Sequence, residues 1–414
     1  MESFEELQVQ QEIIHALNDA GITAPTLIQQ KAIPLIKQGR DVIGISKTGS
    51  GKTAAFGIPL LEKIAPDQGI QVLIVAPTRE LVVQIADEFR ALSSYRRCRI
   101  TSIFGGVSLG PQIEQLRRAE IVAGTPGRLL DHLQRGTIDF SRLRTVVLDE
   151  ADKMVEMGFI DDVHTLLDHT PQDRQLLLFG ATLSAEIDQL VEQYMRDAVT
   201  AEAERQVQQD LLQQYYYQVQ QHEKFSLLCH LLHKADAKRV IIFSSTRSTV
   251  DLLTRNLRVQ GIAAAMMHGK LGQQKRLQVI NNFREGRPPI LVASAVAARG
   301  LHIDDVTHVI NYDLSNDPRE YLHRVGRTAR AGAAGKAITL LGPRDYEAFN
   351  AILGLHRLSV EELPQEEFPR LRFDARRMQM RSGPAQRSRY PVRRGQWHGR
   401  PRSFSFRGER RSFA

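Results

Sequence analysis

Short apolar runs rich in β-branched residues alternate with helical stretches through most of this 414-residue chain. Strand, loop and helix repeated in this order favour a parallel sheet with helices on both faces. The strands expected in the first part are Asp41–Ile45, Val72–Ala76, Ile121–Ala123, Thr145–Leu148 and Gln175–Phe179. Those expected in the second part are Arg239–Phe243, Ile290–Ala293, His308–Asn311 and Lys336–Leu341. The pattern predicts an α/β fold with two similarly built halves.

The alternation stops at two places, and each predicts a boundary. The glutamine-rich stretch 206–221 separates the halves, so we expect domains at 1–203 and 215–362 joined by a linker at 204–214. From 363 to 414, arginine, serine, glycine, proline and glutamine dominate. This composition buries too little apolar surface to offset chain entropy, so we expect the tail to be disordered alone.

The net charge of +8 is unevenly distributed. Residues 370–414 hold 14 arginines and two acids, which leaves the rest of the chain mildly acidic. Such asymmetry indicates a polyanionic partner for the tail. Aromatic residues among the arginines also suit stacking on a single-stranded nucleic acid, although a merely solubilising tail remains an alternative. They are Tyr390, Trp397, Phe404, Phe406 and Phe413.

Hydropathy, the N-terminal sequence and the two cysteines indicate where the protein acts and whether it binds zinc. No apolar run approaches the roughly 18 residues that a membrane span needs, and the acidic N-terminus does not resemble a secretory signal. Cys98 and Cys229 lie far apart and fit no zinc-site spacing, so we expect reduced thiols. These features favour a cytoplasmic protein that does not contact membranes.

The run ISKTGSGKT at 45–53 nearly matches a phosphate-binding loop, with Ser46 in place of the first glycine. It follows a predicted strand and precedes a predicted helix, which directs backbone N–H groups at an anion. Lys52 would reach the β- and γ-phosphates of a nucleotide, and the Thr53 hydroxyl would hold Mg²⁺. The expected nucleotide contacts in this loop are Ser46, Thr48, Gly49, Ser50, Gly51, Lys52 and Thr53.

The run VVLDEAD supplies carboxylates near this loop. Its apolar strand delivers Asp149 at the carboxyl end, where open α/β sheets bind ligands. Asp149 would hold Mg²⁺ directly or through water, and Glu150 would take a proton from an attacking water. The alternative is a solvated acidic turn.

Four motifs occur in order: PTREL at 77–81, TPGR at 125–128, DEAD at 149–152 and HRVGRTAR at 323–330. Over about residues 4–345 the chain resembles the DEAD-box ATP-dependent RNA helicases. The resemblance implies two tandem RecA-like domains, ATP and Mg²⁺ as cofactors, and ATP hydrolysis coupled to local unwinding of short RNA duplexes. An ATP-dependent RNA clamp or annealing protein, and a DNA translocase, remain alternatives.

The resemblance also assigns roles near the nucleotide. Gln29 would read the adenine edge, with Phe4 upstream, and Ile22 replaces the family's usual aromatic residue. Arg327 and Arg330 would act on the γ-phosphate as arginine fingers, beside Lys52, Asp149 and Glu150.

RNA contacts are implied at loops that follow strands in both halves. Those in the first half are Pro77, Thr78, Arg79, Gly105, Gly106, Thr125, Pro126, Gly127 and Arg128. Those in the second half are Gly269, Gln273, Arg276 and Ser294. Contacts of this kind read backbone shape more than base sequence.

A last group would couple the state of the nucleotide to strand separation. It comprises Asp152, Gly180, Ala181, Thr182, Arg299, Gly300 and His323. Gly180 replaces the family's usual serine, and His302 replaces a usual aspartate near the ribose, so we expect looser coupling and weaker ribose contact. The expected partners are RNA and proteins of ribosome assembly or RNA decay, with the chain acting as a monomer.

Overall fold

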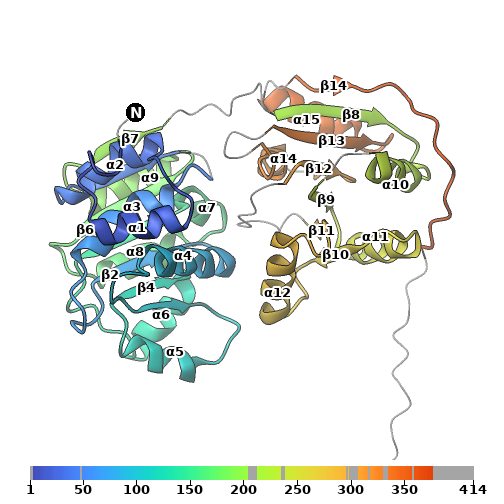
Figure 1. Cartoon of the computed structure of the whole chain (residues 1–414). Helices are drawn as coiled ribbons and strands as arrows, with labels where there is room; N and C mark the ends of the chain where they lie inside the picture. The colour runs from blue at the N-terminus through green and yellow to red at the C-terminus, as the bar shows by residue number, and fades with distance from the viewer. Residues whose placement is uncertain are drawn as a thin grey trace, which may run out of the picture. The chain divides into compact units, whose positions relative to one another are not determined.

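A computed structural model of the chain describes residues 3–46, 49–203, 212–234, 238–294, 297, 306–315, 318–329, 334–356 and 359–375. Figure 1 shows a separate sheet in each half of the chain, blue to green in the first half and light green to red in the second. The predictions for Thr48, Arg299, Gly300, His302, Arg330 and the tail aromatics lie outside the described residues.

The first sheet has seven parallel strands in the described residues, in the order β3-β4-β2-β5-β6-β1-β7. They are β1 (Val42–Ile45), β2 (Val72–Val75), β3 (Ile100–Ile103), β4 (Ile121–Gly124), β5 (Thr145–Asp149), β6 (Gln175–Gly180) and β7 (Val199–Glu202). Its helices are α1 (Gln11–Asp19), α2 (Leu27–Lys37), α3 (Lys52–Lys63), α4 (Arg79–Leu92), α5 (Leu109–Leu116), α6 (Pro126–Gln134), α7 (Ala151–Glu156), α8 (Ile160–Asp168) and α9 (Ala185–Tyr194).

The two faces of this sheet are covered by different helices. Apolar residues of α1 to α4 form one core with alternate strand residues such as Ile74 and Leu177. Residues of α6 to α9 form a second core with the neighbours that point the other way, such as Leu73 and Leu178. Strands buried on both faces need continuous apolar runs, which explains why these strands were readable from sequence.

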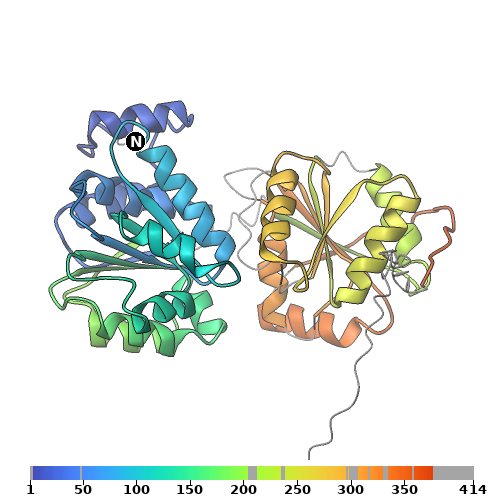
Figure 2. The same ribbon diagram turned by 90° about the horizontal axis from the view of Figure 1, so that it is seen from below.

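The second sheet repeats this architecture with the order β10-β11-β9-β12-β13-β8-β14. Its strands are β8 (Leu212–Gln218), β9 (Val240–Ser244), β10 (Ala264–Met267), β11 (Ile290–Ser294), β12 (His308–Asn311), β13 (Gly335–Leu341) and β14 (Glu361–Glu362). Its described helices include α10 (Lys224–Lys234), α11 (Arg247–Val259), α12 (Gln273–Arg284), α14 (Pro318–Val325) and α15 (Tyr346–His356). Figure 2 shows the twist of this sheet between its helices.

The faces of the second sheet are also divided between helices. Residues of α10 and α11 pack on one face with Ile242 and Ile310. Residues of α12 pack on the other face with Phe243 and Leu291. The prediction of an α/β fold with two sheets of the same design is confirmed.

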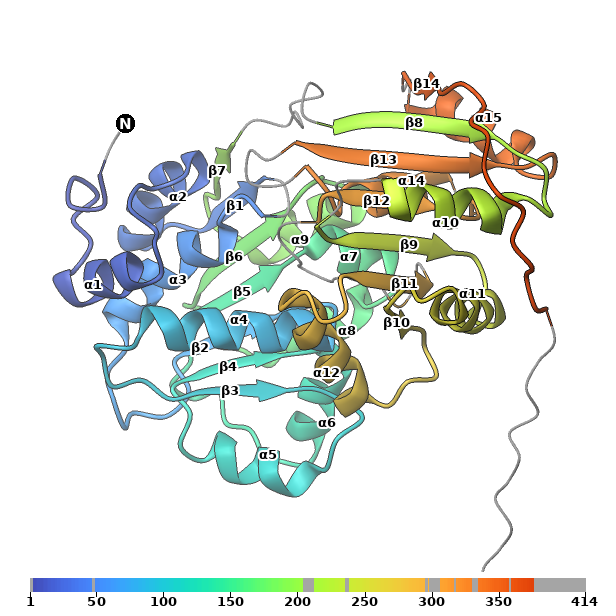
Figure 3. The same cartoon turned by 45° about the vertical axis from the view of Figure 1, so that its right-hand side comes forward.

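The predicted domain boundaries need two corrections. The second half begins earlier than 215, because Leu212 already opens β8, which pairs with β13 along its whole length. The start of the tail at 363 is also too early, since the compact unit extends to Asp374. Figure 3 shows the chain after β14 running along the second half as an extended segment.

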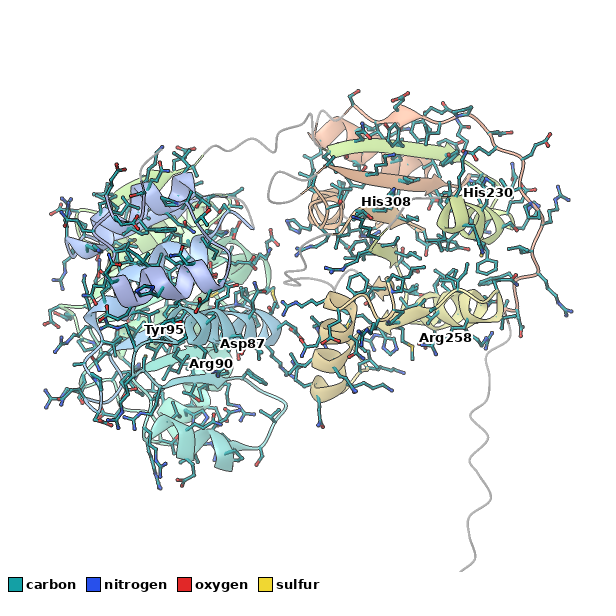
Figure 4. All side chains as sticks on the ribbon, viewed as in Figure 1. Asp87, Arg90, Tyr95, His230, Arg258 and His308 are labelled. Carbon is teal, nitrogen blue, oxygen red and sulfur yellow. The ribbon has the colours of Figure 1, made fainter. Side chains whose placement is uncertain are left out.

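We call residues 363–374 the strap. Its Leu363, Phe368, Leu371 and Phe373 pack against the core under α10 and α11. Its Glu366 accepts hydrogen bonds at Oε1 from the Tyr217 hydroxyl (2.8 Å) and at Oε2 from Lys234 Nζ (2.7 Å) and His230 Nε2 (2.9 Å). These bonds from Lys234, His230 and Tyr217 lower the pKa of Glu366 to about 2. His230 is labelled on α10 in Figure 4.

Candidate nucleotide and nucleic-acid site

The predicted site residues of the first half gather at one edge of its sheet. Ile45 pairs with Gly180, Leu148 with Val75, and Val75 with Gly124, so these strands end level with one another. Because all the strands are parallel, the loops that follow them lie along the same edge. Ser46 and residues 49–51 therefore come together with the PTREL and TPGR segments and the DEAD carboxylates.

The phosphate-binding loop is held by its own polar groups. Ser46 donates its backbone N–H to Gly180 O (3.0 Å), and its hydroxyl accepts a hydrogen bond from Ser50 Oγ (2.8 Å). Lys52 is 7% exposed, and its Nζ donates to Ser46 O (3.2 Å). The ammonium group is thus buried at the start of α3, facing the loop. Ser46 fits the place of the usual small residue and adds a hydrogen bond there.

Gly51 shows why glycine stands before Lys52. Its φ of 87° is left-handed, and a Cβ there would lie 2.4 Å from Gln29 Nε2. Gln29 Nε2 donates to Gly51 O (3.0 Å), while Gln29 Oε1 accepts from the backbone N–H of Thr26 (2.9 Å). Gln29, which is expected to read the adenine, is therefore held against Gly51 of the predicted phosphate-binding loop. Phe4 is 3% exposed and packs within the apolar core formed by α1 to α4.

The two DEAD carboxylates expected to do chemistry are both buried. Asp149 ends β5 and is 3% exposed, and Glu150 is 2% exposed with a left-handed backbone, φ 54° and ψ 48°. Burial raises the pKa of Asp149 to about 7, although Lys52 opposes the shift. A buried carboxylate with this pKa is stabilised in its charged form by a bound cation.

A magnesium site fits this chemistry. Mg²⁺ at nucleotide sites takes one or two carboxylates, a hydroxyl, waters and phosphate oxygens rather than an all-protein cage. Asp149 and Thr53 offer such donors beside Lys52. Among the described residues there is no cluster of three or more His, Cys, Asp or Glu side chains that would hold a metal alone.

Lys153 is a site residue that the sequence reading missed. Its Nζ donates to Glu150 Oε1 (2.9 Å), and the two side chains are 12% and 3% exposed. Burial lowers the pKa of Lys153, although Glu150 opposes the shift. The spacing of three residues between an acid and a base on a helix was a readable signal.

The expected coupling residues of the first half contact one another. Asp152 Oδ2 accepts hydrogen bonds from the backbone N–H groups of Ala181 (3.1 Å) and Thr182 (3.3 Å) and from Thr182 Oγ1 (3.4 Å). A Cβ at Gly180 would lie 3.4 Å from Asp152 Oδ1. A serine would therefore fit at position 180 beside this carboxylate.

Three loops expected to bind RNA brace one another. Thr78 caps α4 by accepting a hydrogen bond from the backbone N–H of Leu81 (3.3 Å). Gly106 has φ +84°, and a Cβ there would lie 2.3 Å from Arg79 Nη1. Arg128 Nη2 donates to Val107 O (3.3 Å). Thr125 and Pro126 begin α6, with Pro126 at its first position, and Gly127 is exposed.

In the second half, Gln273 and Arg276 lie on the first turn of α12. Glu80 Oε1 accepts a hydrogen bond from Gln273 Nε2 (3.2 Å) and lies 3.0 Å from Arg276 Nε. The PTREL glutamate, which closes the Pro77–Glu80 segment expected to bind RNA, is thus the counter-ion of Arg276, another residue expected to bind RNA. Gly269 is exposed, and Ser294 ends β11 with 8% exposure.

The described part of HRVGRTAR is largely buried. Arg327 is 4% exposed, its Nε donates to His323 O (3.0 Å), and burial lowers its pKa while Glu150 raises it. His323 Nε2 lies 3.6 Å from Glu156 Oε1. No role in the site was predicted for Arg324. It donates from Nη2 to Glu320 Oε1 (2.7 Å) and from Nη1 to Asp313 O (2.7 Å). Both partners belong to the second half, so Arg324 stabilises the fold of that half.

Comparison with protein families gives two matches. Residues 26–190 match the model of the DEAD/DEAH box helicase, and residues 223–332 match the helicase conserved C-terminal domain. None of the described helices is long and apolar enough to cross a membrane.

Individual relatives agree with the family matches. The chain is 44% identical over 348 residues to the DEAD-box ATP-dependent RNA helicase CshA of Geobacillus kaustophilus, covering 83% of this chain and 74% of that protein. It is 42% identical over 353 residues to the CshA of Bacillus subtilis, covering 84% and 72%. A solved structure of Saccharomyces cerevisiae Dbp5 bound to RNA and ADP BeF3 is 31% identical, with TM-score 0.78 and coverage of 88% and 96%.

Proposed function

Because this chain belongs to the DEAD/DEAH box helicase family, we propose that it is an ATP-dependent RNA helicase that unwinds short duplexes locally. ATP hydrolysis stimulated by RNA would supply the energy for each opening. Support comes from the relatives named as RNA helicases and from the Dbp5 structure bound to RNA and ADP BeF3.

In this proposal the edge of the first sheet binds the nucleotide. Gln29 and Phe4 serve the adenine end of the site, and Lys52 binds phosphate oxygens. Ser46, Thr48, Gly49, Ser50 and Gly51 would also contact the phosphates, and Thr53 and Asp149 would hold Mg²⁺, which would neutralise charge at the phosphates. Glu150 accepts the proton of the attacking water, and Arg327 and Arg330 stabilise charge on the γ-phosphate.

RNA binds across the loops of both halves. Backbone N–H groups, hydroxyls and guanidinium groups of Pro77–Arg79, Gly105–Gly106 and Thr125–Arg128 contact phosphates, as do Gly269, Gln273, Arg276 and Ser294. Asp152, Gly180, Ala181, Thr182, Arg299, Gly300 and His323 couple this binding to the nucleotide. Since ATP and RNA favour the same state of the protein, each tightens the binding of the other by an equal factor.

The observation that carries the proposal is the placement of Lys52, Asp149 and Glu150, all buried at one sheet edge. The test measures ATP hydrolysis with no nucleic acid, with single-stranded RNA, and with DNA of the same sequence. We expect RNA, but not DNA, to stimulate ATP hydrolysis. We also expect a short RNA duplex to be unwound only when ATP is present. Equal stimulation by DNA would favour a DNA translocase, and unwinding that persists in Glu150→Gln would favour an RNA clamp.

The proposal extends to the setting of the protein. We take the working unit to be a monomer in the cytoplasm, with Mg²⁺ and ATP as cofactors. Proteins of ribosome assembly or RNA decay would direct it to its RNA. Crosslinking RNA to the protein in its own cell, followed by sequencing, identifies that RNA.

A further inference from the structure

A buried chain of hydrogen bonds runs behind the RNA loops of the first half. His132 on α6 is fully buried, and Gln112 on α5 is 4% exposed. His132 Nε2 lies 3.1 Å from Gln112 Oε1, and His132 Nδ1 lies 2.8 Å from Thr137 Oγ1. Gln112 Nε2 donates to Phe104 O (3.0 Å). The chain thus links α6, α5 and the backbone that precedes Gly105.

The direction of these bonds follows from donor chemistry. Gln112 uses its amide N–H on Phe104 O, so the oxygen that faces His132 can only accept. His132 Nε2 must therefore carry the proton. Burial, with Arg128 nearby, lowers the pKa of His132 and favours the neutral ring. Nδ1 is then the acceptor. The single proton of the Thr137 hydroxyl is shared between Nδ1 (2.8 Å) and the His132 carbonyl oxygen (3.1 Å), with Nδ1 the nearer acceptor.

This series of hydrogen bonds ends at Phe104 O, in a loop for which no nucleotide contact is proposed. Phe104 O is the carbonyl immediately before Gly105 and Gly106, whose N–H groups face the RNA in the proposed function. The same loop is held by Arg128 through Val107 O and lies against Arg79 at Gly106. A buried donor that loses its partner costs more than an exposed one, so the conformation of the loop depends on each bond in the chain.

We propose that His132 is a positioning residue that, acting through Gln112, holds the 104–107 loop in its RNA-binding conformation. This inference rests on the proposed function. A histidine that merely fills the core would contribute to stability alone. A positioning residue contributes to RNA affinity and leaves the nucleotide site unchanged, because no bond of the chain reaches Lys52, Gln29 or Asp149.

The test uses the full-length protein and a fluorescent single-stranded RNA. We expect His132→Phe to raise the Kd for RNA by about tenfold, as the loss of one buried hydrogen bond implies. The Kd for a fluorescent ADP analogue should stay within about twofold of the parent. His164→Phe is the matched control, because His164 on α8 pairs with the Tyr194 hydroxyl on α9 (3.2 Å) rather than with Gln112.

Two further variants keep the test decisive if His132→Phe folds poorly. Glutamine can place an amide N–H near the position of Nε2, whereas asparagine reaches only the position of Nδ1. We expect His132→Gln to retain RNA affinity and His132→Asn to lose it. Equal RNA affinity for these two variants, or a parallel loss of ADP affinity in both, would overturn the inference. Absence of RNA binding by the parent would instead refute the proposed function.

Discussion

Lys153 Nζ donates a hydrogen bond of 2.9 Å to Glu150 Oε1, and both groups are almost completely buried. In the proposed mechanism Glu150 accepts a proton from water. An ammonium group on the same carboxylate stabilises its charged form and occupies one of its lone pairs. Lys153 therefore restrains Glu150, the proposed base.

The first prediction concerns this restraint. Lys153→Met should raise ATP hydrolysis without RNA by roughly tenfold, because a hydrogen bond to a charged group contributes about 1.5–3 kcal/mol. The stimulation by RNA should fall accordingly, and KM for ATP should change little. Lys153→Arg, which keeps a cation at this position, is the control and should behave as the parent. A slower basal rate in Lys153→Met would show that Lys153 supports catalysis instead.

The second prediction uses the raised pKa of Asp149. The folded protein binds this proton more tightly than the unfolded chain, whose pKa is near 3.8. The associated stability is complete below pH 3.8 and is lost as the pH rises through about 7. Without Mg²⁺ and nucleotide, Asp149→Asn should raise Tm above that of the parent by at least about 2 °C at pH 8, and by less at pH 5.

The control for this experiment is Asp173→Asn, which changes an exposed carboxylate. It should shift Tm equally at both pH values. A shift for Asp149→Asn that does not depend on pH would contradict the burial argument.

The third prediction concerns coupling at Gly180. Space for a side chain exists beside Asp152, since a Cβ would lie 3.4 Å from Oδ1. Gly180→Ser adds a hydroxyl that can donate to this carboxylate, so we expect more duplex unwound per ATP hydrolysed. Gly180→Ala controls for the added Cβ. Paired ATPase and unwinding assays give the amount of duplex unwound per ATP hydrolysed. An unchanged value for Gly180→Ser would show that the hydroxyl does not contribute to coupling.

The fourth prediction tests the strap. Glu366→Gln removes a charge that accepts three hydrogen bonds, and should destabilise the second half by about 1–2 kcal/mol at pH 7. Because the pKa of Glu366 falls from 4.5 to about 2, this stability is present above pH 4.5 and is lost as the pH falls toward 2. Urea unfolding measures it, with the exposed neighbour Glu367→Gln as control. Equal effects of the two substitutions would mean that the strap is not anchored by Glu366.

The strands that were predicted from sequence are those buried on both faces. Runs such as Val72–Val75 and Thr145–Asp149 are apolar throughout and lie inside the sheet. The sequence reading missed β3, β7 and β10, which lie at the edges of their sheets. Polar residues interrupt the apolar pattern in β3 and β7, and the AAMM run of β10 lacks the β-branched and aromatic residues typical of strands. The start of β8 was assigned to the linker because its glutamines interrupt the apolar pattern expected of a strand.

The sequence analysis assigned residues 363–374 to the tail because it judged residues 363–414 by their average composition. The arginine-rich tail hid the apolar residues Leu363, Phe368, Leu371 and Phe373, which are spaced along an extended backbone. In the candidate site, the motifs indicated the residues that we propose contact nucleotide or RNA. Residues that act through another residue, such as His132 and Gln112, come from different helices, and no sequence spacing links them.

The central claim is that one nucleotide pocket in the first half becomes hydrolytic only with guanidinium groups from the second half. The most direct measurement is the rate of ATP hydrolysis by the double variant Arg327→Ala, Arg330→Ala at saturating RNA and ATP. The account predicts a loss of on the order of 10³-fold or more, with ADP affinity close to that of the parent. Hydrolysis at the parent's rate with RNA present would contradict it.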